Sequence, residues 1–591
     1  MKLSDYIVEF LKDNCVTTIF GYQGGAITHF VDSIYKADRI KFISNYHEQA
    51  SAFAAEGYAR VSGNIGVCTA TSGPGATNLI TGIGSAYFDS IACLYITGQV
   101  NTYEYKRSNE IRQEGFQETD IVSIIKPITK YAVMITSAEK IKYYLEKAFY
   151  MAKEGRPGPV LLDIPMNIQR AEINQKGLIG FYESEEYKNK IKNGVNIEDV
   201  TSLIDLIKNS ERPVILAGGG IRLAKATGKF EKLIELTAIP VACTLMGIDC
   251  INHNHECYVG YMGAYGNRYS NLAVANCDLL IVLGSRLTTR QTSSITDSFA
   301  RAAKIVHVDI DKNELNIKVK EYLSIECDLN LFVNKLNQEL EKSLYKFDFS
   351  SWMDKINIYK KDYPSYKSTK NINEIDPNEF MNRLSKILHP NSIICLDIGQ
   401  NQIWASQSLK LGTNQRLLNA GGMGPMGFGL PAAIGAWHAK PNYKIVVITG
   451  DGGIQMNIQE LQTIAREKIP IKIIIMNNQA LGMIRHFQEM YFDSNYYGTI
   501  DGYSAADFIK IGEAYGIKSL KIENLAQINQ LKEKLNDDES YVIEVELKNI
   551  TYVDPKLGMD RPIEDQEPLL DREQLKENMI IDMYKYARRN K

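Results

Sequence analysis

Residues 444–482 read KIVVITGDGGIQMNIQELQTIAREKIPIKIIIMNNQALG, and this stretch determines the fold class. The apolar run Lys444–Thr449 predicts a buried strand that ends at Gly450-Asp451-Gly452, and Ile471–Met476 predicts a second strand that ends at Asn477-Asn478. The 24 residues between the glycine triplet and the asparagine pair leave room for one crossover helix. The two strands are therefore expected to pair in parallel, and both polar ends then emerge at the carboxyl edge, where α/β sheets bind ligands.

The same alternation of strand and helix runs through most of the 591 residues. Strands are predicted at Lys41–Tyr46, Ile65–Thr71, Ile91–Thr97, Pro213–Leu216, Pro240–Thr244, Asp278–Leu283, Lys304–Val308 and Ile393–Ile398. Helices are predicted at Glu48–Val61, Ala76–Phe88, Gly427–His438 and Ile458–Glu467. The predicted fold class is α/β, with three doubly wound parallel-sheet domains at 1–170, 190–340 and 375–550 and a tail at 551–591. The charged segments Gln169–Asp199 and Lys342–Asn373 are interpreted as linkers with short helices.

Composition excludes several classes of protein. Lys and Arg total 67 against 70 Asp and Glu, so a chain with a formal charge of −3 has no overall field for nucleic acid or an anionic membrane. No apolar run is long enough to span a bilayer, and the charged N-terminal 25 residues are interpreted as an amphipathic helix rather than a signal peptide. The nine cysteines never occur in CxxC spacing, which favours buried thiols in a reducing, cytoplasmic compartment.

Asp451 and Asn478 stand where two neighbouring strands end. Their oxygens are hard ligands suited to Mg²⁺ or Ca²⁺ rather than zinc. Because two side chains cannot complete an octahedron, phosphate oxygens are expected to supply further ligands. A pair of ordinary turns, Asp-Gly and Asn-Asn, is the alternative explanation of these residues.

The spacing of GDG and NN matches the thiamine-diphosphate signature, and its surroundings resemble the large catalytic subunit of acetolactate synthase. The resemblance covers nearly all of residues 1–545, through the motifs GYQGGAI, NYHEQASAFAAEGYAR, TSGPGATNLITGI, RPGPVLLDIP, TLMG and GGMGPMGFGLPAAIGA. It implies a pyrimidine-binding first domain, a central FAD-type domain and a diphosphate-binding third domain. It further implies a carboligase that decarboxylates pyruvate and transfers the two-carbon unit to a carbonyl acceptor.

The family resemblance assigns roles to individual residues. Asp451, Asn478 and the carbonyl of Ala480 would bind Mg²⁺ against the cofactor diphosphate. Glu48 would hydrogen-bond the cofactor's pyrimidine ring and control its proton, Met426 would wedge under the thiazolium ring, and Gln117 would act at the catalytic centre. The remaining thiamine-diphosphate residues are Gly399, Gln400, Asn401, Gln402, Gly424, Gly452, Gly453, Gly482 and Met483. Asn401 replaces the family's histidine, so it can donate a hydrogen bond but cannot carry charge.

FAD is also implied by the resemblance, as a cofactor without a redox role. The matching positions are Arg156, Gly218, Gly219, Gly220, Thr244, Leu245, Met246, Gly263, Gly284, Arg286, Arg290, Asp309 and Asp328. Thr288 and Thr289 stand where two acidic residues are expected, a departure from the family pattern. Gly218-Gly219-Gly220 alone would be explained equally well by a tight turn, since it is not a GxGxxG fingerprint. The cluster His253–Cys257 lacks a second ligand group and is interpreted as a loop rather than a zinc site.

The predicted substrate pocket contains Gly25, Gln113, Phe116, Gln117, Met483 and Phe487. It differs from the family in three ways: the segment NTYEYKRSNEIRQEGFQE at 101–118 is longer, Phe487 replaces a tryptophan, and the Pro-rich tail, expected as an extended lid, is unlike the usual ending. These features resemble carboligases of branched-deoxysugar pathways. The acceptor is therefore left open between a second 2-oxo acid and a nucleotide-linked ketosugar.

Three other functions remain as alternatives. An FAD-linked pyruvate oxidase would use the flavin for electron transfer, and a simple 2-oxo acid decarboxylase would capture the two-carbon unit with a proton. A catalytically silent subunit is disfavoured because Glu48, Asp451 and Asn478 are all present. The resemblance implies at least a homodimer with shared active sites, or a tetramer, and leaves open a small regulatory subunit.

Overall fold

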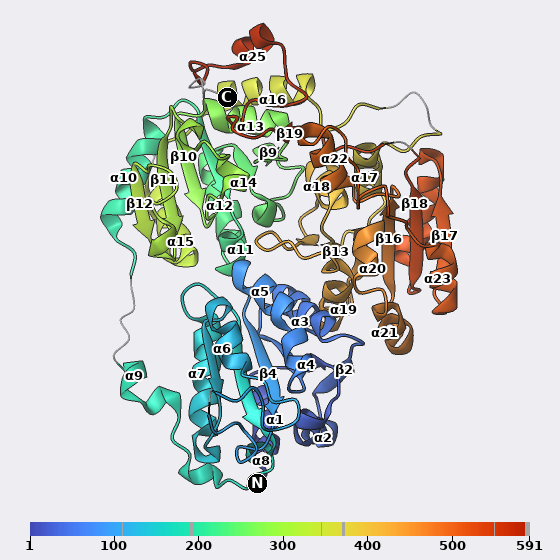
Figure 1. The fold of residues 1–591 in the computed structure, drawn as a ribbon. Coiled ribbons are helices and arrows are strands. Elements are labelled where there is room, and N and C mark those ends of the chain that lie inside the picture. The colour runs from blue at the N-terminus through green and yellow to red at the C-terminus, as the bar shows by residue number, and fades with distance from the viewer. Residues whose placement is uncertain (109, 189–193, 344, 369–372, 549, 586–591) are drawn as a thin grey trace.

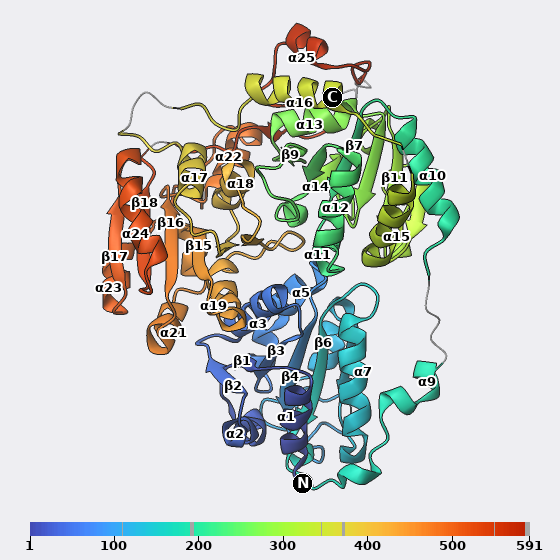
Figure 2. The same ribbon diagram turned by 180° about the vertical axis from the view of Figure 1, so that it is seen from behind.

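The computed structural model describes residues 1–108, 110–188, 194–343, 345–368, 373–548 and 550–585. Three six-stranded sheets follow one another along the chain, each built only of parallel strand pairs. In Figure 1 the first sheet lies at the bottom, the central one at the upper left and the third at the right. Figure 2 shows the same three layered units from behind, with helices on both faces of each sheet. The predicted α/β class with three parallel sheets is confirmed.

The first sheet has the order β2-β1-β3-β4-β6-β5. Its strands are β1 (Thr18–Gly21), β2 (Lys41–Ser44), β3 (Gly66–Ala70), β4 (Cys93–Gln99), β5 (Tyr131–Met134) and β6 (Val160–Pro165). Helices of this part of the chain are α1 (Leu3–Asp13), α2 (Thr28–Lys36), α3 (Glu48–Ser62), α4 (Pro74–Asn78), α5 (Ile80–Phe88), α6 (Ile121–Ile125), α7 (Ile141–Lys153), α8 (Met166–Gln169) and α9 (Glu185–Lys188). β3, β4 and β6 are buried along their whole length, as expected for strands covered on both faces.

The central sheet has the order β12-β11-β10-β7-β8-β9. Its strands are β7 (Pro213–Ala217), β8 (Val241–Cys243), β9 (Tyr258–Tyr261), β10 (Leu279–Leu283), β11 (Lys304–Asp309) and β12 (Leu323–Glu326). The helices are α10 (Ile197–Lys208), α11 (Gly220–Leu223), α12 (Thr227–Thr237), α13 (Arg268–Asn276), α14 (Thr289–Thr292), α15 (Leu329–Lys342) and α16 (Ser350–Asp362).

The third sheet, with the order β14-β13-β15-β16-β18-β17, carries the GDG and NN motifs. Its strands are β13 (Ser392–Leu396), β14 (Arg416–Leu418), β15 (Lys444–Gly450), β16 (Ile471–Asn477), β17 (Lys518–Ile522) and β18 (Tyr541–Glu546). The helices are α17 (Pro377–Ser385), α18 (Gln400–Ser408), α19 (Gly429–Ala439), α20 (Asp451–Gln455), α21 (Glu460–Glu467), α22 (Gly482–Tyr491), α23 (Phe508–Ala514) and α24 (Leu531–Asn536). β15 and β16 are neighbours, so the predicted pairing at the motif is confirmed.

Several local predictions are wrong. The N-terminal 25 residues are not one helix, because Thr18–Gly21 is buried and pairs with both β2 and β3. The helix predicted at Ala76–Phe88 is broken at Leu79 into α4 and α5. The segment predicted as a linker at 342–373 contains the 13-residue helix α16, whose side chains Trp352, Ile356 and Tyr359 are buried against the central domain. Residues 189–193 and 369–372 of the two predicted linkers lie outside the described residues.

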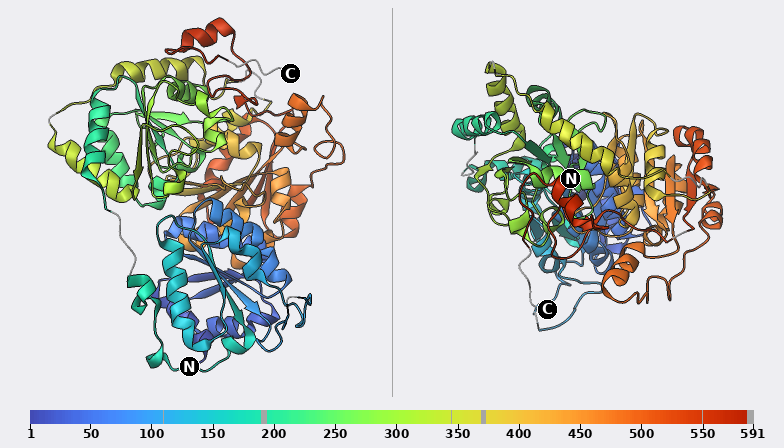
Figure 3. Two further views of the ribbon diagram at one scale, coloured as in Figure 1. Left: turned by 60° about the vertical axis from the view of Figure 1, so that its left-hand side comes forward. Right: turned by 90° about the horizontal axis from the view of Figure 1, so that it is seen from above.

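The tail crosses from the third sheet to the central domain. It contains a two-stranded antiparallel pair, β19 (Lys556–Leu557) and β20 (Gln566–Glu567), and the helix α25 (Arg572–Asn578). Arg268 of α13 donates hydrogen bonds to the carbonyls of Gln566 (3.2 Å) and Pro568 (2.7 Å). In the left view of Figure 3 the tail lies over the central domain, on the side remote from the first sheet. The tail is therefore not simply extended, and most of it packs on the central domain.

Helices α3 and α19 join the first and third domains at very close range. A Cβ atom at Gly57 would lie 2.2 Å from the carbonyl oxygen of Ala432, and one at Gly435 would lie 1.8 Å from that of Ala54. Only glycine permits such an approach of one helix backbone to the other. This α3–α19 contact fixes how the two domains sit in one chain.

No helix among the described residues has the length and apolar character needed to cross a lipid bilayer. Eight of the nine cysteines are buried and Cys15 is exposed; all nine are free thiols.

Candidate active site

The carboxyl edge of the third sheet brings together residues that the sequence places far apart. Asp451 follows β15, Asn478 follows β16, and Gln400 starts α18 shortly after β13, which neighbours β15. Asn478 Nδ2 donates a hydrogen bond to Gln400 Oε1 at 2.9 Å, and a Cβ at Gly482 would lie 2.1 Å from that oxygen. The GDG and NN motifs follow neighbouring strands as predicted, and Gln400 of the GQNQ segment lies beside Asn478.

Asp451 is the best candidate for binding a cation. Its side chain is 2% exposed, and Oδ2 has no hydrogen-bond partner in the described part of the chain. Burial raises the pKa of Asp451 to about 6. A buried carboxylate oxygen without a partner is costly unless a cation or donor meets it. This donor therefore fits a divalent cation, with Mg²⁺ suited to the all-oxygen set.

The other two predicted metal ligands lie within the same turn. Asn478 uses both hydrogens of its amide nitrogen, toward Gln400 Oε1 (2.9 Å) and Thr551 Oγ1 (2.8 Å), so its Oδ1 is the atom left for a cation. That oxygen accepts only a long bond, 3.3 Å, from the Ala480 amide. The Ala480 carbonyl accepts the Gly482 amide at 2.9 Å and has a second lone pair.

Asn401 is bound to the backbone through its amide nitrogen, and its Oδ1 lies 3.4 Å from where a Cβ on Gly450 would stand. Its amide nitrogen donates to the carbonyls of Asp397 (2.8 Å) and Ile448 (3.2 Å), and the side chain is 2% exposed. The residue therefore holds the ends of β13 and β15 together. An uncharged amide suits this role because its protonation state does not change. Gln402 is buried as well, with a 3.4 Å bond to the Ala420 carbonyl. Of the GQNQ segment, Gln400 alone is hydrogen-bonded to Asn478.

The loop around Met426 is anchored at both ends by buried carboxylates that sequence reasoning missed. Asp89 of the first domain accepts the amides of Gly421 (3.0 Å) and Gly422 (2.7 Å). Asp397 accepts the Gly427 amide at 2.9 Å, and burial raises its pKa to about 6. In the sequence, Asp89 and Asp397 are marked only as acidic residues at the end of an apolar run.

Between these anchors the loop exposes backbone and apolar side chains. Gly424 has φ +67°, which favours glycine, and a Cβ there would meet nothing within 4 Å. The Met426 methyl carbon lies 3.3 Å from where a Cβ on Gly452 would stand. The loop therefore places Met426 over the GDG turn, and its role in shaping a bound cofactor stays a prediction.

Glu48 begins α3 and is 8% exposed. Its Oε2 accepts a hydrogen bond from Asn78 Nδ2 at 2.9 Å, and Oε1 lies 3.1 Å from the position of a Cβ on Gly75. Next to it, Gln49 Oε1 accepts a bond from Asn457 (3.2 Å), and Asn457 also donates to the Gly427 carbonyl (2.9 Å). The glutamate is thus fixed by Asn78, a residue not predicted from the sequence, and the first turn of α3 is tied to the Met426 loop.

The predicted substrate-pocket residues fall into two sets. Gly25, Gln113, Phe116 and Gln117 lie in the first domain, and Met483 and Phe487 lie on α22; in the described residues no hydrogen bond or ring contact joins the sets. Gln117 has φ +64°, a conformation that non-glycine residues adopt mainly where their surroundings impose it. Phe116 is 85% exposed. Phe487 packs against Tyr491 and Phe492 at ring distances of 4.9 and 5.7 Å.

Thr551, beyond the region covered by the resemblance, hydrogen-bonds both Asn478 and Gln400 at this edge. Its hydroxyl donates to Gln400 Oε1 at 2.8 Å and accepts from Asn478 Nδ2, and its carbonyl accepts from Gln400 Nε2 and from Arg485. Of the tail, Thr551 reaches this edge, Tyr552 and Lys556 contact α22 of the third domain, and Gln566 and Pro568 pack on the central domain. A lid function for the tail stays a prediction.

Replacing Thr551 by valine is expected to weaken the affinity for Mg²⁺ with thiamine diphosphate by about 10- to 100-fold, the usual effect of losing a partner that orients a metal ligand. Valine keeps the shape but leaves the Asn478 amide hydrogen unpaired. Quenching of tryptophan fluorescence on cofactor titration measures the affinity. Thr551→Ser, which retains the hydroxyl, is the matched control and should bind like the wild type. Equal affinities for valine and wild type would contradict this role.

A separate cavity of about 470 Å³ lies where the three domains meet. Nine of the thirteen predicted FAD residues line it: Arg156, Gly219, Gly220, Thr244, Met246, Gly284, Arg286, Asp309 and Asp328. Thr288, at one of the two departures from the family, lines it too. Gly218 serves close packing instead, since its Cβ would lie 2.1 Å from the Gly284 carbonyl oxygen. Leu245, Gly263 and Arg290 lie outside the lining, and the Arg290 guanidinium covers the ring of Tyr265.

Charge in this cavity fits a nucleotide diphosphate. Arg286 has no carboxylate within 4.0 Å in the described residues, and burial together with the Arg156 guanidinium lowers its pKa. A half-buried guanidinium without a carboxylate partner favours an anion. Asp309 is 8% exposed, and burial raises its pKa; it is placed to accept hydroxyl donors. The residues present therefore fit FAD.

Arg286→Met is expected to weaken FAD binding by at least about tenfold, because the variant loses a charge-assisted contact to the diphosphate. Flavin fluorescence on titration of the purified protein measures the affinity. Arg39→Met, at a side chain 88% exposed in an ion pair, is the control and should leave the affinity unchanged. An unchanged affinity in Arg286→Met would show that this cavity does not hold the flavin diphosphate.

Three family models match the chain in order. They are the thiamine pyrophosphate enzyme N-terminal TPP binding domain at residues 1–124, the central domain at 200–336 and the C-terminal TPP binding domain at 397–545. A probable acetolactate synthase large subunit of Methanococcus aeolicus is 38% identical over 565 residues, covering 92% of each chain. The acetolactate synthase large subunit of Lactococcus lactis is 35% identical over 94% of each chain. The isozyme 2 large subunit of Escherichia coli is 34% identical over 94% of this chain and 97% of its own.

Proposed function

Because this chain belongs to the thiamine pyrophosphate enzymes, and is an enzyme of the acetolactate synthase type, we propose that it decarboxylates pyruvate and joins the two-carbon unit to a second carbonyl compound. The observation that carries this proposal is the buried, unpartnered Asp451 oxygen beside Asn478, in a chain that also keeps Glu48. A subunit that had lost catalysis would have no need for all three.

Each of these residues has a defined task in the proposed reaction. Thiamine diphosphate, when bound, supplies the carbon nucleophile and stabilises the charge left by loss of CO₂. Asp451, Asn478 and the Ala480 carbonyl would hold Mg²⁺ against the diphosphate, with Thr551 and Gln400 orienting Asn478. Glu48, fixed by Asn78, would hold and return the proton on the pyrimidine side. Met426 would exclude water and support the thiazolium ring of the cofactor.

FAD is proposed as a structural cofactor in the 470 Å³ cavity. Its support is the unpaired Arg286 and the lining by nine predicted residues. If the protein were instead a pyruvate oxidase, the flavin would bleach when pyruvate is added without oxygen. An unchanged flavin spectrum under those conditions is the result expected for a carboligase.

The acceptor is proposed to be a 2-oxo acid or a nucleotide-linked ketosugar. The relatives are named acetolactate synthases, which favours a 2-oxo acid. Phe487 in an aromatic cluster, with the Lys556 ammonium 5.9 Å from its ring centre, and the exposed Phe116 in a lengthened entrance segment favour a larger acceptor. These features concern residues that would meet the acceptor rather than pyruvate.

Product analysis with ¹³C-pyruvate decides between the two acceptors. The purified chain with thiamine diphosphate and Mg²⁺ is offered pyruvate alone, pyruvate with 2-ketobutyrate, and pyruvate with a nucleotide-linked dideoxy-ketosugar, and products are followed by NMR. Fast acetolactate formation from pyruvate alone, unaffected by the sugar, would exclude the sugar acceptor. Free acetaldehyde as the main product in all three mixtures would overturn the carboligase proposal.

A homodimer with shared active sites is proposed as the working form. Its support is the exposure of apolar side chains on segments that carry or adjoin the predicted cofactor residues: Met423, Met456 and Ile484 are 47%, 54% and 55% exposed and Tyr497 is 81% exposed. Exposed apolar patches of this kind mark interfaces or ligand sites. The relatives' names describe them as large subunits, and a small partner subunit of this chain is proposed on that ground alone.

A further inference from the structure

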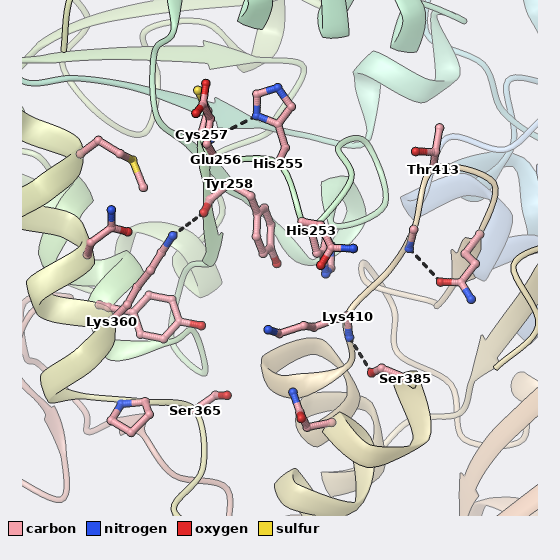
Figure 4. A pocket seen from close by; sticks show the side chains of 18 of the residues that line it. His253, His255, Glu256, Cys257, Tyr258, Lys360, Ser365, Ser385, Lys410 and Thr413 are labelled. Atoms are coloured by element: carbon pink, nitrogen blue, oxygen red, sulfur yellow. Dashed lines mark hydrogen bonds between the residues drawn. The ribbon is translucent and has the colours of Figure 1, made fainter. Parts of the chain in front are cut away.

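A second, larger cavity lies apart from both cofactor sites. Its volume is about 1440 Å³, and its walls come from residues 253–258 of the central domain, from α16, and from α17 and residues 410–415 of the third domain. Figure 4 shows it from close by, with Lys360 on the α16 side and Lys410 on the opposite side. Lys410 follows α18, the helix whose first residue, Gln400, contacts Asn478.

Lys360 and Lys410 carry unneutralised positive charge in this cavity. Lys360 Nζ donates to the Tyr258 carbonyl at 2.6 Å. Within the described residues, neither ammonium has a carboxylate within 4.0 Å; Lys360 is half-buried and Lys410 is exposed. Burial, and next the charge of Lys410, lower the pKa of Lys360 to about 8. The two cations therefore face a common space that repels further cations.

The acidic groups of the cavity do not neutralise these lysines. Glu256, Asp348 and Asp354 line it from exposed positions, and Asp348 accepts the Ser350 amide at 3.0 Å. The two histidines are committed to the fold. His253 is stacked on Tyr258 and both its ring nitrogens meet backbone carbonyls, and His255 Nδ1 accepts the Cys257 amide at 3.1 Å.

Polar side chains on the third-domain wall are likewise occupied. Ser385 Oγ accepts the Lys410 amide (2.8 Å) and donates to the Met381 carbonyl (2.9 Å), and Gln415 bonds the Gly412 amide and the His389 carbonyl. The remaining lining is in part apolar and aromatic, with Phe349, Met353 and Tyr258. A ligand here would therefore find ammonium groups without a carboxylate partner in the described residues, those of Lys360, Lys410 and the exposed Lys386, beside an apolar wall.

We propose that this cavity binds a small organic phosphate, with the phosphate held between Lys360 and Lys410 and the organic part against the apolar wall. A phosphate monoester carries close to two negative charges at neutral pH and a diphosphate carries more, so either matches two ammonium groups, whereas a single carboxylate carries one. Lysine suits phosphate as a point charge. The cavity is larger than the ~300–1,000 Å³ of common ligand sites, so it has room for such a molecule with its water.

Binding is tested on the full chain saturated with thiamine diphosphate, Mg²⁺ and FAD, so that the cofactor diphosphate sites are filled. Equilibrium dialysis with labelled inorganic pyrophosphate is expected to find one additional site per chain. The double variant Lys360→Met with Lys410→Met should bind at least about 30-fold more weakly, since both charges are lost. Lys361→Met, on the exposed neighbour of Lys360 in α16, should bind like the wild type. Absence of an additional site, or equal binding by the double variant, would overturn the proposal.

A second measurement uses the unaltered protein. Reductive methylation followed by mass spectrometry reports the reactivity of each lysine amine. Pyrophosphate is expected to slow methylation of Lys360 and Lys410 at least about fivefold and to leave Lys361 unchanged, because a bound anion covers the two amines and raises their pKa. Acetate at the same concentration, with one negative charge, should protect neither. Equal protection by acetate, or no protection by pyrophosphate, would contradict a phosphate site.

Discussion

Glu48→Gln is expected to reduce turnover of pyruvate by about 10²- to 10⁴-fold, the range typical for loss of a group that transfers or controls a proton. Glutamine keeps the length of the side chain and can still accept the hydrogen bond from Asn78, which is 2.9 Å in the wild type. It cannot hold a proton on the carboxyl. The loss should therefore appear in kcat, with the fold and the affinity for thiamine diphosphate nearly unchanged.

Release of CO₂ from labelled pyruvate measures the rate, and fluorescence titration measures the cofactor affinity. Glu139→Gln, at an exposed glutamate, is the control and should turn over like the wild type. A Glu48→Gln enzyme within about threefold of wild-type turnover would remove Glu48 from the proposed chemistry. A large fall in cofactor affinity at constant kcat would assign Glu48 to binding alone.

Asp451→Ala is expected to reduce the affinity for Mg²⁺ with thiamine diphosphate by more than about 100-fold, beyond the usual effect of losing an orienting partner. The variant loses the one charged ligand among the three predicted. In the wild type, proton and cation compete for this carboxylate. Since burial raises its pKa to about 6, the affinity for Mg²⁺ should fall as the pH is lowered through 6 and level off above it.

Stability without cofactor separates this effect from misfolding. Removing a buried carboxylate oxygen that has no partner should raise the free energy of unfolding of the cofactor-free protein by roughly 1–3 kcal/mol at neutral pH. Urea unfolding with and without Mg²⁺ and thiamine diphosphate measures both changes. A cofactor-free variant that is less stable than the wild type, or a variant that still binds Mg²⁺ tightly, would argue against the assignment of Asp451.

Mixing the two inactive variants tests the shared site. If the Glu48 of one chain serves the metal site of its partner, co-assembled Glu48→Gln and Asp451→Ala chains contain one intact site in each mixed dimer and should recover about a quarter of wild-type activity overall after random mixing. The Gln49–Asn457 contact also ties α3 to the Met426 loop within one chain. Verified mixed dimers without activity would place Glu48 and Asp451 of the same chain in one site.

Much of the fold could be predicted because parallel strands buried on both faces are continuous apolar runs, as in β15 and β16. β1 was missed because its four residues follow a helix without a clear break, and α16 was missed because its buried Trp352, Ile356 and Tyr359 stand among lysines. Asp451 and Asn478 were predicted since strand ends in one sheet must meet at one edge, whereas Gln400 was assigned through the family resemblance. Asn78, Asp89 and Thr551 were not, because their partners are distant in sequence and no local pattern marks them.

The backbone contact between Gly57 and Ala432 and between Gly435 and Ala54 has a consequence for exchanging parts between homologous chains. This α3–α19 contact, the seam between the first and third domains, has no space for a methyl group. Side-chain adjustments cannot relieve a clash there, so residues on α3 and α19 have to change together. Chimaeras that take residues 1–170 from one homologue and the remainder from another should fail to assemble unless both sides of the seam match, whereas exchange of the central portion alone leaves this seam intact.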